Sequence, residues 1–241
     1  MAQILNERVT LAVQDGTTMA AYVARPAEGD RHPGMMVFQE AFGVNAHIRE
    51  VADRFAREGF VTIAPELFHR TAPGFEESYD NFEATRPHTA ALTEDSLEDD
   101  VRAAYDWLHA DTRTDPAHTA SIGFCMGGRV SFIANSILPV DAAISFYGGG
   151  IAPALLPRAF QLHAPMLMFW GGLDRHIGSD KIRDVVDALH AAGKEYVNVE
   201  FSHANHGFFC NARASYHKDA AQESWELVKS FLTTHIHSGR G

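Results

Sequence analysis

Short apolar segments alternate with amphipathic segments along most of this chain, and the alternation predicts its elements. Apolar runs typical of buried strands lie at residues 35–39, 61–64, 119–124, 141–147, 165–170 and 196–201. Apolar residues with helical spacing predict helices at residues 47–58, 97–108, 179–192 and 220–234, and another that begins near residue 129. Strands separated by helices require a mostly parallel sheet with helices on both faces, which is an α/β fold.

The N-terminal part departs from this alternation. Two runs at residues 8–13 and 19–25, joined through Asp15-Gly16, predict an antiparallel hairpin, which brings the sheet to about eight strands. Between residue 64 and Thr93 the pattern indicates only a loop-rich excursion. Asp95 and Glu98 are suited to cap the helix that follows it.

The composition adds limits on class and partners. A chain of 241 residues, 46% of them hydrophobic, without a low-complexity linker, predicts one domain over residues 1–241. A formal net charge of -11 argues against nucleic acid or an anionic membrane as a partner, because no basic patch is present to neutralise phosphates. No signal peptide is recognised, and no apolar run approaches the roughly 18 residues of a membrane span. We therefore expect a cytoplasmic location.

The segment GFCMGG at residues 123–128 places Cys125 between a predicted strand and a predicted helix. That is the strand, turn and helix context of a nucleophile elbow, in which small glycines permit the sharp turn. Cys125 is thus a candidate nucleophile. The alternative is a small apolar residue in a turn, since unpaired cysteines are often buried.

Two later residues have the order and placement of the partners in an α/β-hydrolase triad. Asp174 follows the strand at residues 165–170 and the pair Gly171-Gly172, and His206 lies in the loop after the strand at residues 196–201. A turn or helix-capping aspartate is the alternative for Asp174. His203 is the competing histidine, and the Gly-Phe pair after His206 favours His206.

These residue types together support acyl transfer. A histidine within hydrogen-bond reach takes the thiol proton, and an aspartate fixes the tautomer of the ring and stabilises its positive charge. The negative oxygen of the tetrahedral intermediate would be held by the backbone N–H of Met126 and by a second N–H from the loop after the third strand. That loop carries Glu40 at the end of an apolar strand, where a carboxylate is costly unless it is paired. Glu40 is either a site residue that tunes the thiol or a structural carboxylate held by Arg49 or Arg129.

The chain resembles the dienelactone hydrolase family, also called carboxymethylenebutenolidases, a branch of the α/β-hydrolases with a cysteine nucleophile. The matching segments are spread over most of the chain, at residues 40–45, 48–55, 61–68, 123–128, 171–174 and 206–208. The resemblance implies an α/β-hydrolase fold, a role in the degradation of aromatic compounds, and the opening of enol-lactones through an acyl-cysteine intermediate, without a cofactor or a metal.

The resemblance also implies roles for individual residues. Cys125, Asp174 and His206 would form the triad, and the glutamate at Glu40 would switch the thiol into its reactive form. The N–H groups of Ala41 and Met126 would form the oxyanion hole. The substrate would be a small-molecule ester or lactone; the sequence does not indicate an oligomeric state.

Substrate recognition departs from the family pattern. The type enzymes hold the lactone carboxylate with two arginines, one of them four residues after the catalytic histidine, where this chain has Cys210. Arg213 lies nearby in sequence, Arg86 is the candidate for the other arginine, and Tyr147 is a candidate pocket residue. A general esterase of small esters is therefore an alternative substrate class.

Two non-hydrolase alternatives remain at this stage. His203, His206 and Cys210 have the residue types and the local spacing of a zinc site. A thiol-based binding or redox-sensing protein could also retain the fold and a reactive cysteine without turnover.

Overall fold

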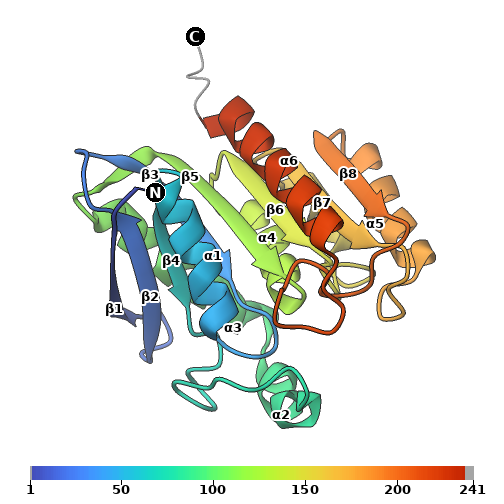
Figure 1. Cartoon of the computed structure of the whole chain (residues 1–241), viewed down its shortest axis with the longest axis horizontal. Helices are drawn as coiled ribbons and strands as arrows, with labels where there is room; N and C mark the ends of the chain where they lie inside the picture. The colour runs from blue at the N-terminus through green and yellow to red at the C-terminus, as the bar shows by residue number, and fades with distance from the viewer. Residues whose placement is uncertain (1, 237–241) are drawn as a thin grey trace. The chain divides into compact units, whose positions relative to one another are not determined.

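The computed structural model describes residues 2–236 and contains an eight-stranded sheet (Figure 1). The strand order is β1-β2-β4-β3-β5-β6-β7-β8. The N-terminal strands pair antiparallel and the β3–β4, β6–β7 and β7–β8 pairs are parallel. The predicted mostly parallel α/β sheet is confirmed. The chain forms two compact units, Met1–Ala120 and Ser121–Gly241.

The first unit begins with the predicted hairpin, whose first strand starts four residues earlier than the sequence indicated and ends one residue earlier. Strands β1 (Ile4–Ala12) and β2 (Thr18–Pro26) pair so that Leu11 faces Met19, and the turn contains Gly16 with a φ of 86°. Strands β3 (His32–Phe38) and β4 (Val61–Pro65) follow the pattern of the apolar runs closely. They are buried because helices cover the sheet.

Helices α1 (Ala46–Arg57) and α3 (Glu94–Ala110) lie on the two sides of the sheet in this unit (Figure 1). The Asn45 side chain caps α1 by accepting from the Ile48 N–H at 3.3 Å. For α3 the cap is a reciprocal pair between Thr93 and Ser96, each side chain bonding the backbone N–H of the other. The prediction that Asp95 and Glu98 cap this helix is wrong, because the shorter Thr93 and Ser96 hydroxyls reach the N–H groups directly.

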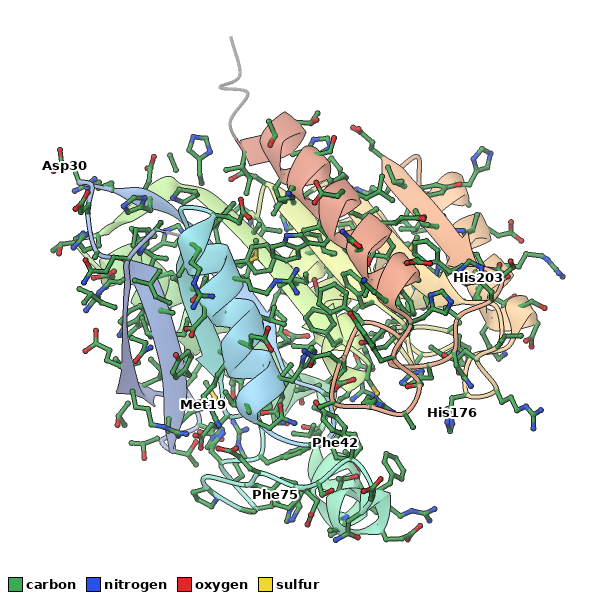
Figure 2. All side chains as sticks on the ribbon, in the orientation of Figure 1. Met19, Asp30, Phe42, Phe75, His176 and His203 are labelled. Atoms are coloured by element: carbon green, nitrogen blue, oxygen red, sulfur yellow. The ribbon has the colours of Figure 1, made fainter. Side chains whose placement is uncertain are left out.

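The excursion after β4 contains a helix that the sequence pattern did not predict, α2 (Phe82–Ala91). Only Thr85 of this helix is buried, and Pro87 lies inside it. A helix with almost no buried face shows no apolar periodicity, and an internal proline is evidence against a helix. Neither the apolar pattern nor the proline therefore indicated a helix at these residues. Glu77 donates its N–H to Phe42 O, and the Phe42 and Tyr79 rings lie 4.6 Å apart, so the excursion packs on the Glu40 loop (Figure 2).

The second unit starts near the end of β5 (Thr114–Phe124) and alternates as predicted. Its elements are α4 (Met126–Ile137), β6 (Ala142–Phe146), η1 (Leu156–Gln161), β7 (Met166–Gly171), α5 (Ser179–Ala191), β8 (Tyr196–Phe201) and α6 (Lys218–Ile236). In Figure 1, α6 covers one side of these strands, and α4 and α5 lie on the other. The short 3-10 helix η1 was not predicted.

A row of aromatic rings supports the carboxyl ends of the strands in this unit. The ring centroids of Phe124 and Phe146 lie 4.9 Å apart, those of Phe146 and Phe169 lie 4.4 Å apart, and Phe201 continues the row at 6.4 Å from Phe169. Each phenylalanine belongs to a different strand, from β5 through β8. Within residues 2–236, no helix is long and apolar enough to span a membrane.

Candidate active site

Cys125 stands at a strained turn between β5 and α4, as the elbow motif predicts. Its φ is 56° and its ψ is -117°, a conformation that costs a non-glycine residue energy and that is typical of functional turns. Its backbone N–H donates to Phe146 O at 3.0 Å, which ties the turn to the next strand. A Cβ on Gly123 would lie 1.8 Å from Gly127 O, so only glycine permits this turn.

The first turn of α4 supplies backbone donors next to the thiol. Met126 is the first residue of the helix, and N–H groups in a first turn have no acceptor within the helix. The positive end of the helix dipole acts at the same place. The predicted role of the Met126 N–H in an oxyanion hole is therefore compatible with its position.

Asp174 is held three residues after β7 by the backbone of its own loop. Its Oδ1 accepts the N–H groups of His176 at 2.7 Å and Ile177 at 3.2 Å. Burial raises the pKa of the carboxyl, but the hydrogen bond and charge of His206 and the two N–H donors outweigh burial and lower it. Asp174 therefore stays ionised at neutral pH.

His206 joins the aspartate to the cysteine. Its Nδ1 lies 2.6 Å from Asp174 Oδ2, and its ring is also hydrogen bonded to the Cys125 side chain. Burial lowers the pKa of the imidazole, but the bonds to Asp174 and Cys125 outweigh it and raise the pKa to about 10. The ring consequently carries its proton at neutral pH. The structure brings together the three predicted triad side chains.

Aromatic and histidine rings surround His206. Tyr147 is fully buried, and its backbone φ is 39°. Its ring centroid lies 5.0 Å from that of the His206 ring. The exposed His176 ring lies 5.3 Å from it in an edge-to-face geometry (Figure 2). Sequence reasoning missed His176; its only signal was its position two residues after Asp174.

The two candidate arginines have different surroundings. The Arg213 guanidinium lies over Gly207, whose φ is 78° and whose added Cβ would come within 2.6 Å of it. Arg213 is thus adjacent to the residue after His206. Arg86 lies in α2, with a 65% exposed side chain that pairs with Glu83 at 3.0 Å. Substrate binding by either arginine stays a prediction.

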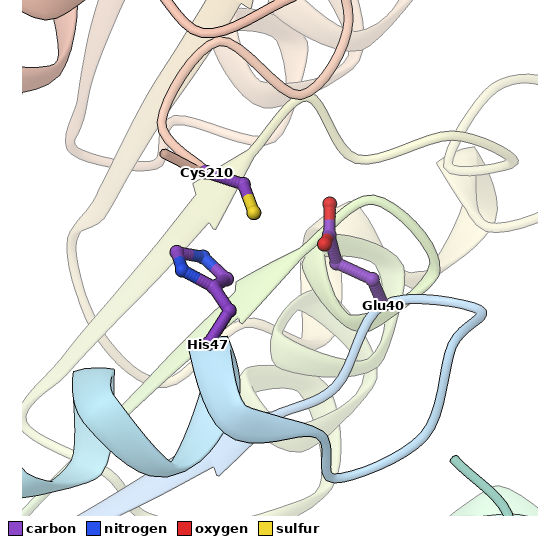
Figure 3. Close-up of side chains that lie close together, drawn as sticks. All are labelled: Glu40, His47 and Cys210. Atoms are coloured by element: carbon purple, nitrogen blue, oxygen red, sulfur yellow. The ribbon is translucent and has the colours of Figure 1, made fainter. Parts of the chain in front are cut away.

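Glu40 and Ala41 lie just past β3 in the first unit and are buried. A carboxylate oxygen of Glu40 and a ring nitrogen of His47, in the first turn of α1, lie within 4.8 Å of each other (Figure 3). Arg49, considered above as a partner of Glu40, donates through Nη1 to Val44 O and to Glu76, both at 2.5 Å. The histidine neighbour of Glu40 was not predicted.

The histidines of the zinc alternative have separate partners. The His203 ring packs 4.5 Å from the His217 ring and 6.3 Å from Phe201, whereas His206 is bonded to Asp174. Among residues 2–236, His203, His206 and Cys210 are not a group whose ligand atoms lie within 4.8 Å of one another. The zinc alternative is therefore wrong for these three residues. No disulfide joins Cys125 and Cys210.

Comparisons with known proteins identify the family. A sequence profile of the dienelactone hydrolase family matches residues 19–236, a range that contains the three predicted triad residues and Glu40. A Synechocystis sp. protein named "Putative carboxymethylenebutenolidase" is 34% identical over 227 residues, covering 90% of this chain and 92% of that protein. A protein of the same name from Methylorubrum extorquens is 33% identical, covering 93% of this chain and 79% of its own length.

A solved structure supports the same fold. It is described as the crystal structure of a "Putative Dienelactone Hydrolase" from Klebsiella pneumoniae subsp. pneumoniae and superposes with a TM-score of 0.87. The superposition covers 96% of this chain and 99% of that chain, at 29% sequence identity.

Proposed function

This chain belongs to the dienelactone hydrolase family, and we propose that it opens an enol-lactone or a related small carboxylic ester through an acyl-cysteine intermediate on Cys125. That it is a carboxylic ester hydrolase follows from the family; the intermediate and the substrate are the proposal. The observation that carries it is His206, bonded on one side to Asp174 at 2.6 Å and on the other to the Cys125 side chain at the elbow.

The arrangement of His206 and Cys125 supports attack by sulfur. In the proposed reactive form, the Cys125 thiolate, which is the nucleophilic form of cysteine, is paired with the protonated His206 ring. The sulfur attacks the carbonyl carbon, and the carbonyl electron pair moves to oxygen. The resulting oxyanion lies where the Met126 N–H can donate to it. Its collapse breaks the C–O bond and gives the acyl-cysteine, while His206 protonates the departing alcohol or enol oxygen.

Hydrolysis of the acyl-cysteine uses the same histidine as a base. Neutral His206 takes a proton from water, whose oxygen attacks the thioester carbon. Collapse of the second tetrahedral intermediate breaks the C–S bond, releases the carboxylic acid and restores the thiolate with its imidazolium. In a lactone the leaving oxygen remains attached to the acyl group, so the product is a single ring-opened acid.

The roles of Glu40 and Ala41 belong to this proposal as well. In the resemblance the glutamate switches the thiol when substrate arrives, and the N–H of the next residue completes the oxyanion hole. A buried Glu40 beside His47 is compatible with a carboxylate that has a functional reason to be inside, because isolated buried carboxylates are costly. Glu40→Gln is expected to slow acylation more than deacylation.

Substrate recognition is proposed for Tyr147, Arg213 and Arg86. Tyr147 contacts the His206 ring and Arg213 overlies Gly207, so both border the triad. Because Cys210 replaces the family arginine, a general esterase of small neutral esters is the second candidate function. We also propose a single functional domain and a reducing cytoplasmic location, since an active thiol must stay reduced.

The test compares a cis- or trans-dienelactone with p-nitrophenyl acetate, both followed by absorbance, for the wild type and Cys125→Ala. Efficient lactone opening that depends on Cys125, with poor ester turnover, supports a dienelactone hydrolase. Ester turnover alone supports the general esterase. Absence of activity on both substrates supports a binding or redox-sensing protein.

Cys210→Ala is the matched control for the nucleophile. Cys210 is the other cysteine of the chain and is buried, but it lies in the loop after β8 and not at the elbow. We expect Cys210→Ala to retain most of the turnover and Cys125→Ala to lose it. Equal losses in the two variants would rule out Cys125 as the specific nucleophile.

A further inference from the structure

A cavity of about 160 Å³ lies between the loop after β6, the end of β7 and the start of α5. Trp170 and Val185 form apolar parts of its wall, Gly148 and Gly150 contribute backbone, and His176 and Lys181 add an imidazole and an ammonium group. All of these residues belong to the second unit. None of them is a member of the triad.

The cavity adjoins the triad on two sides. His176 donates its backbone N–H to Asp174 and lays its ring against the His206 ring at 5.3 Å. Gly148 packs against the first turn of α4, where a Cβ on Gly128 would lie 2.7 Å from the Gly148 Cα. His176 is thus a residue of the cavity wall that also contacts two triad residues, and Gly148 is one that also contacts α4.

The size of the cavity limits its occupant. A volume of about 160 Å³ is close to the ~150 Å³ of an engineered apolar cavity that binds benzene. A six-membered ring or an acyl chain of similar bulk fits this space. Gly148 is required in this wall, since a Cβ there would come within 3.0 Å of Ile151 and 2.4 Å of Ser145 Oγ.

Lys181 gives the cavity its charge. Its side chain is 44% exposed, and its Nζ lies 3.6 Å from Asp184 and 3.9 Å from Asp180. Partly exposed ion pairs at such distances contribute little, so the ammonium can exchange them for a carboxylate of a ligand. In a chain with a formal net charge of -11, a local cation is what an anionic substrate requires.

We propose that this cavity is an acyl-group subsite, in which Trp170 and Val185 contact the ring or chain of the substrate and Lys181, with His176 beside it, binds an anionic group on that substrate. The subsite would make Lys181 a determinant of specificity, at a position that the family resemblance did not indicate. The inference rests on the proposed function for its kinetic consequence, but not for the binding it predicts.

The binding test uses benzoate and benzamide as probes of one size that differ in charge, with calorimetry on the intact protein. We expect benzoate to bind the wild type, Lys181→Gln to weaken benzoate at least 10-fold, and benzamide affinity to change less than 2-fold in that variant. Val185→Phe should fill the cavity and weaken both probes, and Val185→Ile does so partially if the larger residue prevents folding. Benzoate affinity that is equal in the wild type and in Lys181→Gln would overturn the proposal, whether or not the protein hydrolyses esters.

The kinetic test compares the p-nitrophenyl hemiester of glutaric acid with its neutral methyl ester. Lys181→Gln should lower kcat/KM for the anionic ester at least 10-fold through KM and leave the neutral ester within 2-fold. Lys229→Gln is the matched control, because Lys229 lies on α6 and pairs with Glu226 at 2.9 Å. Equal losses on both esters would overturn the assignment of Lys181. Hydrolysis of both esters at a rate that does not depend on Cys125 would instead overturn the proposed function. The calorimetric comparison of benzoate binding would then still test the subsite.

Discussion

Two buried aspartates, one in each unit, are each hydrogen bonded to a basic side chain, but their pKa values are shifted in opposite directions. Asp174 in the second unit has its pKa lowered, whereas Asp100 in the first unit has its pKa raised to about 6. Burial raises the pKa of both. Asp174 offsets it with two backbone N–H donors and a hydrogen-bonded histidine, while Asp100 has Arg70 as its main partner.

The Arg70 pair shows why a cation alone does not suffice. Asp100 is 0% exposed, and Arg70 contacts both of its oxygens at 2.9 Å, but only the Nη1 contact has hydrogen-bond geometry. Arg70 also donates to Asp15. The His69 Nε2 atom lies 3.9 Å from Asp100 Oδ1, and burial lowers the pKa of that imidazole. Asp100 is buried more deeply than Asp174, at 0% against 9% exposed, and burial outweighs its bond to Arg70. At Asp174 the hydrogen bond and charge of His206, with the two N–H donors, outweigh burial. A charged Asp174 is what its proposed role beside His206 requires.

The largest effect expected concerns the catalytic side of this comparison. Asp174→Asn keeps the shape of the side chain but removes the charge that holds His206, so kcat should fall on the order of 10⁴-fold, as for triad aspartates elsewhere. Asp100→Asn should leave kcat within about 2-fold, because the pair stabilises structure and carries no reacting group. Steady-state hydrolysis of p-nitrophenyl acetate measures both. A similar loss of kcat in the two variants would contradict a catalytic role that belongs to Asp174 and not to Asp100.

The second effect tests the structural side. Arg70→Met leaves Asp100 buried without its cation and should lower the free energy of unfolding by about 3–5 kcal/mol. Arg57→Met is the control, since Arg57 is partly exposed and lies 3.8 Å from Asp53, an ion pair that contributes about 0–1 kcal/mol. Urea denaturation measures both. A loss below about 1 kcal/mol for Arg70→Met would show that Asp100 does not depend on it.

The third effect is a pH dependence with opposite signs. Because the pKa of Asp100 is raised to about 6, the folded state binds a proton there that the unfolded state has lost, so stability falls as pH rises from about 4 to about 6. Asp174, with its lowered pKa, contributes stability above the unfolded pKa that is lost as pH falls through the folded pKa. Asp100→Asn should remove the loss between pH 4 and 6; its persistence would contradict the assignment to Asp100.

The fourth effect is spectroscopic and does not depend on turnover. His206, with its pKa raised to about 10, contributes stability that is complete below the unfolded pKa of about 6.5 and is lost as pH rises toward 10. NMR titration of its ring should show the proton retained well above neutral pH in the wild type and lost at lower pH in Asp174→Asn. A ring that titrates near 6.5 in the wild type would contradict a bonded imidazolium.

The two aspartates also show how far the sequence could be interpreted. Asp174 was predicted because the strand before it, the glycine pair and the order of the triad are local signals. Asp100 was not, since it meets Arg70 thirty residues away by a path through the excursion, which has no apolar periodicity. The same reason hid α2, which has one buried residue and an internal proline. The position of His47 within 4.8 Å of Glu40 also left no signal in the apolar pattern. Strand and helix positions followed the apolar pattern, but partners distant in the chain required the fold.

Acid-quenched mass spectrometry during turnover of p-nitrophenyl acetate tests the central claim, acyl transfer through Cys125, most directly. We expect an acetyl group on the peptide that contains Cys125, absent from that peptide in Cys125→Ala and more abundant when deacylation is slowed. Steady turnover without acetyl on Cys125, and undiminished in Cys125→Ala, would contradict it.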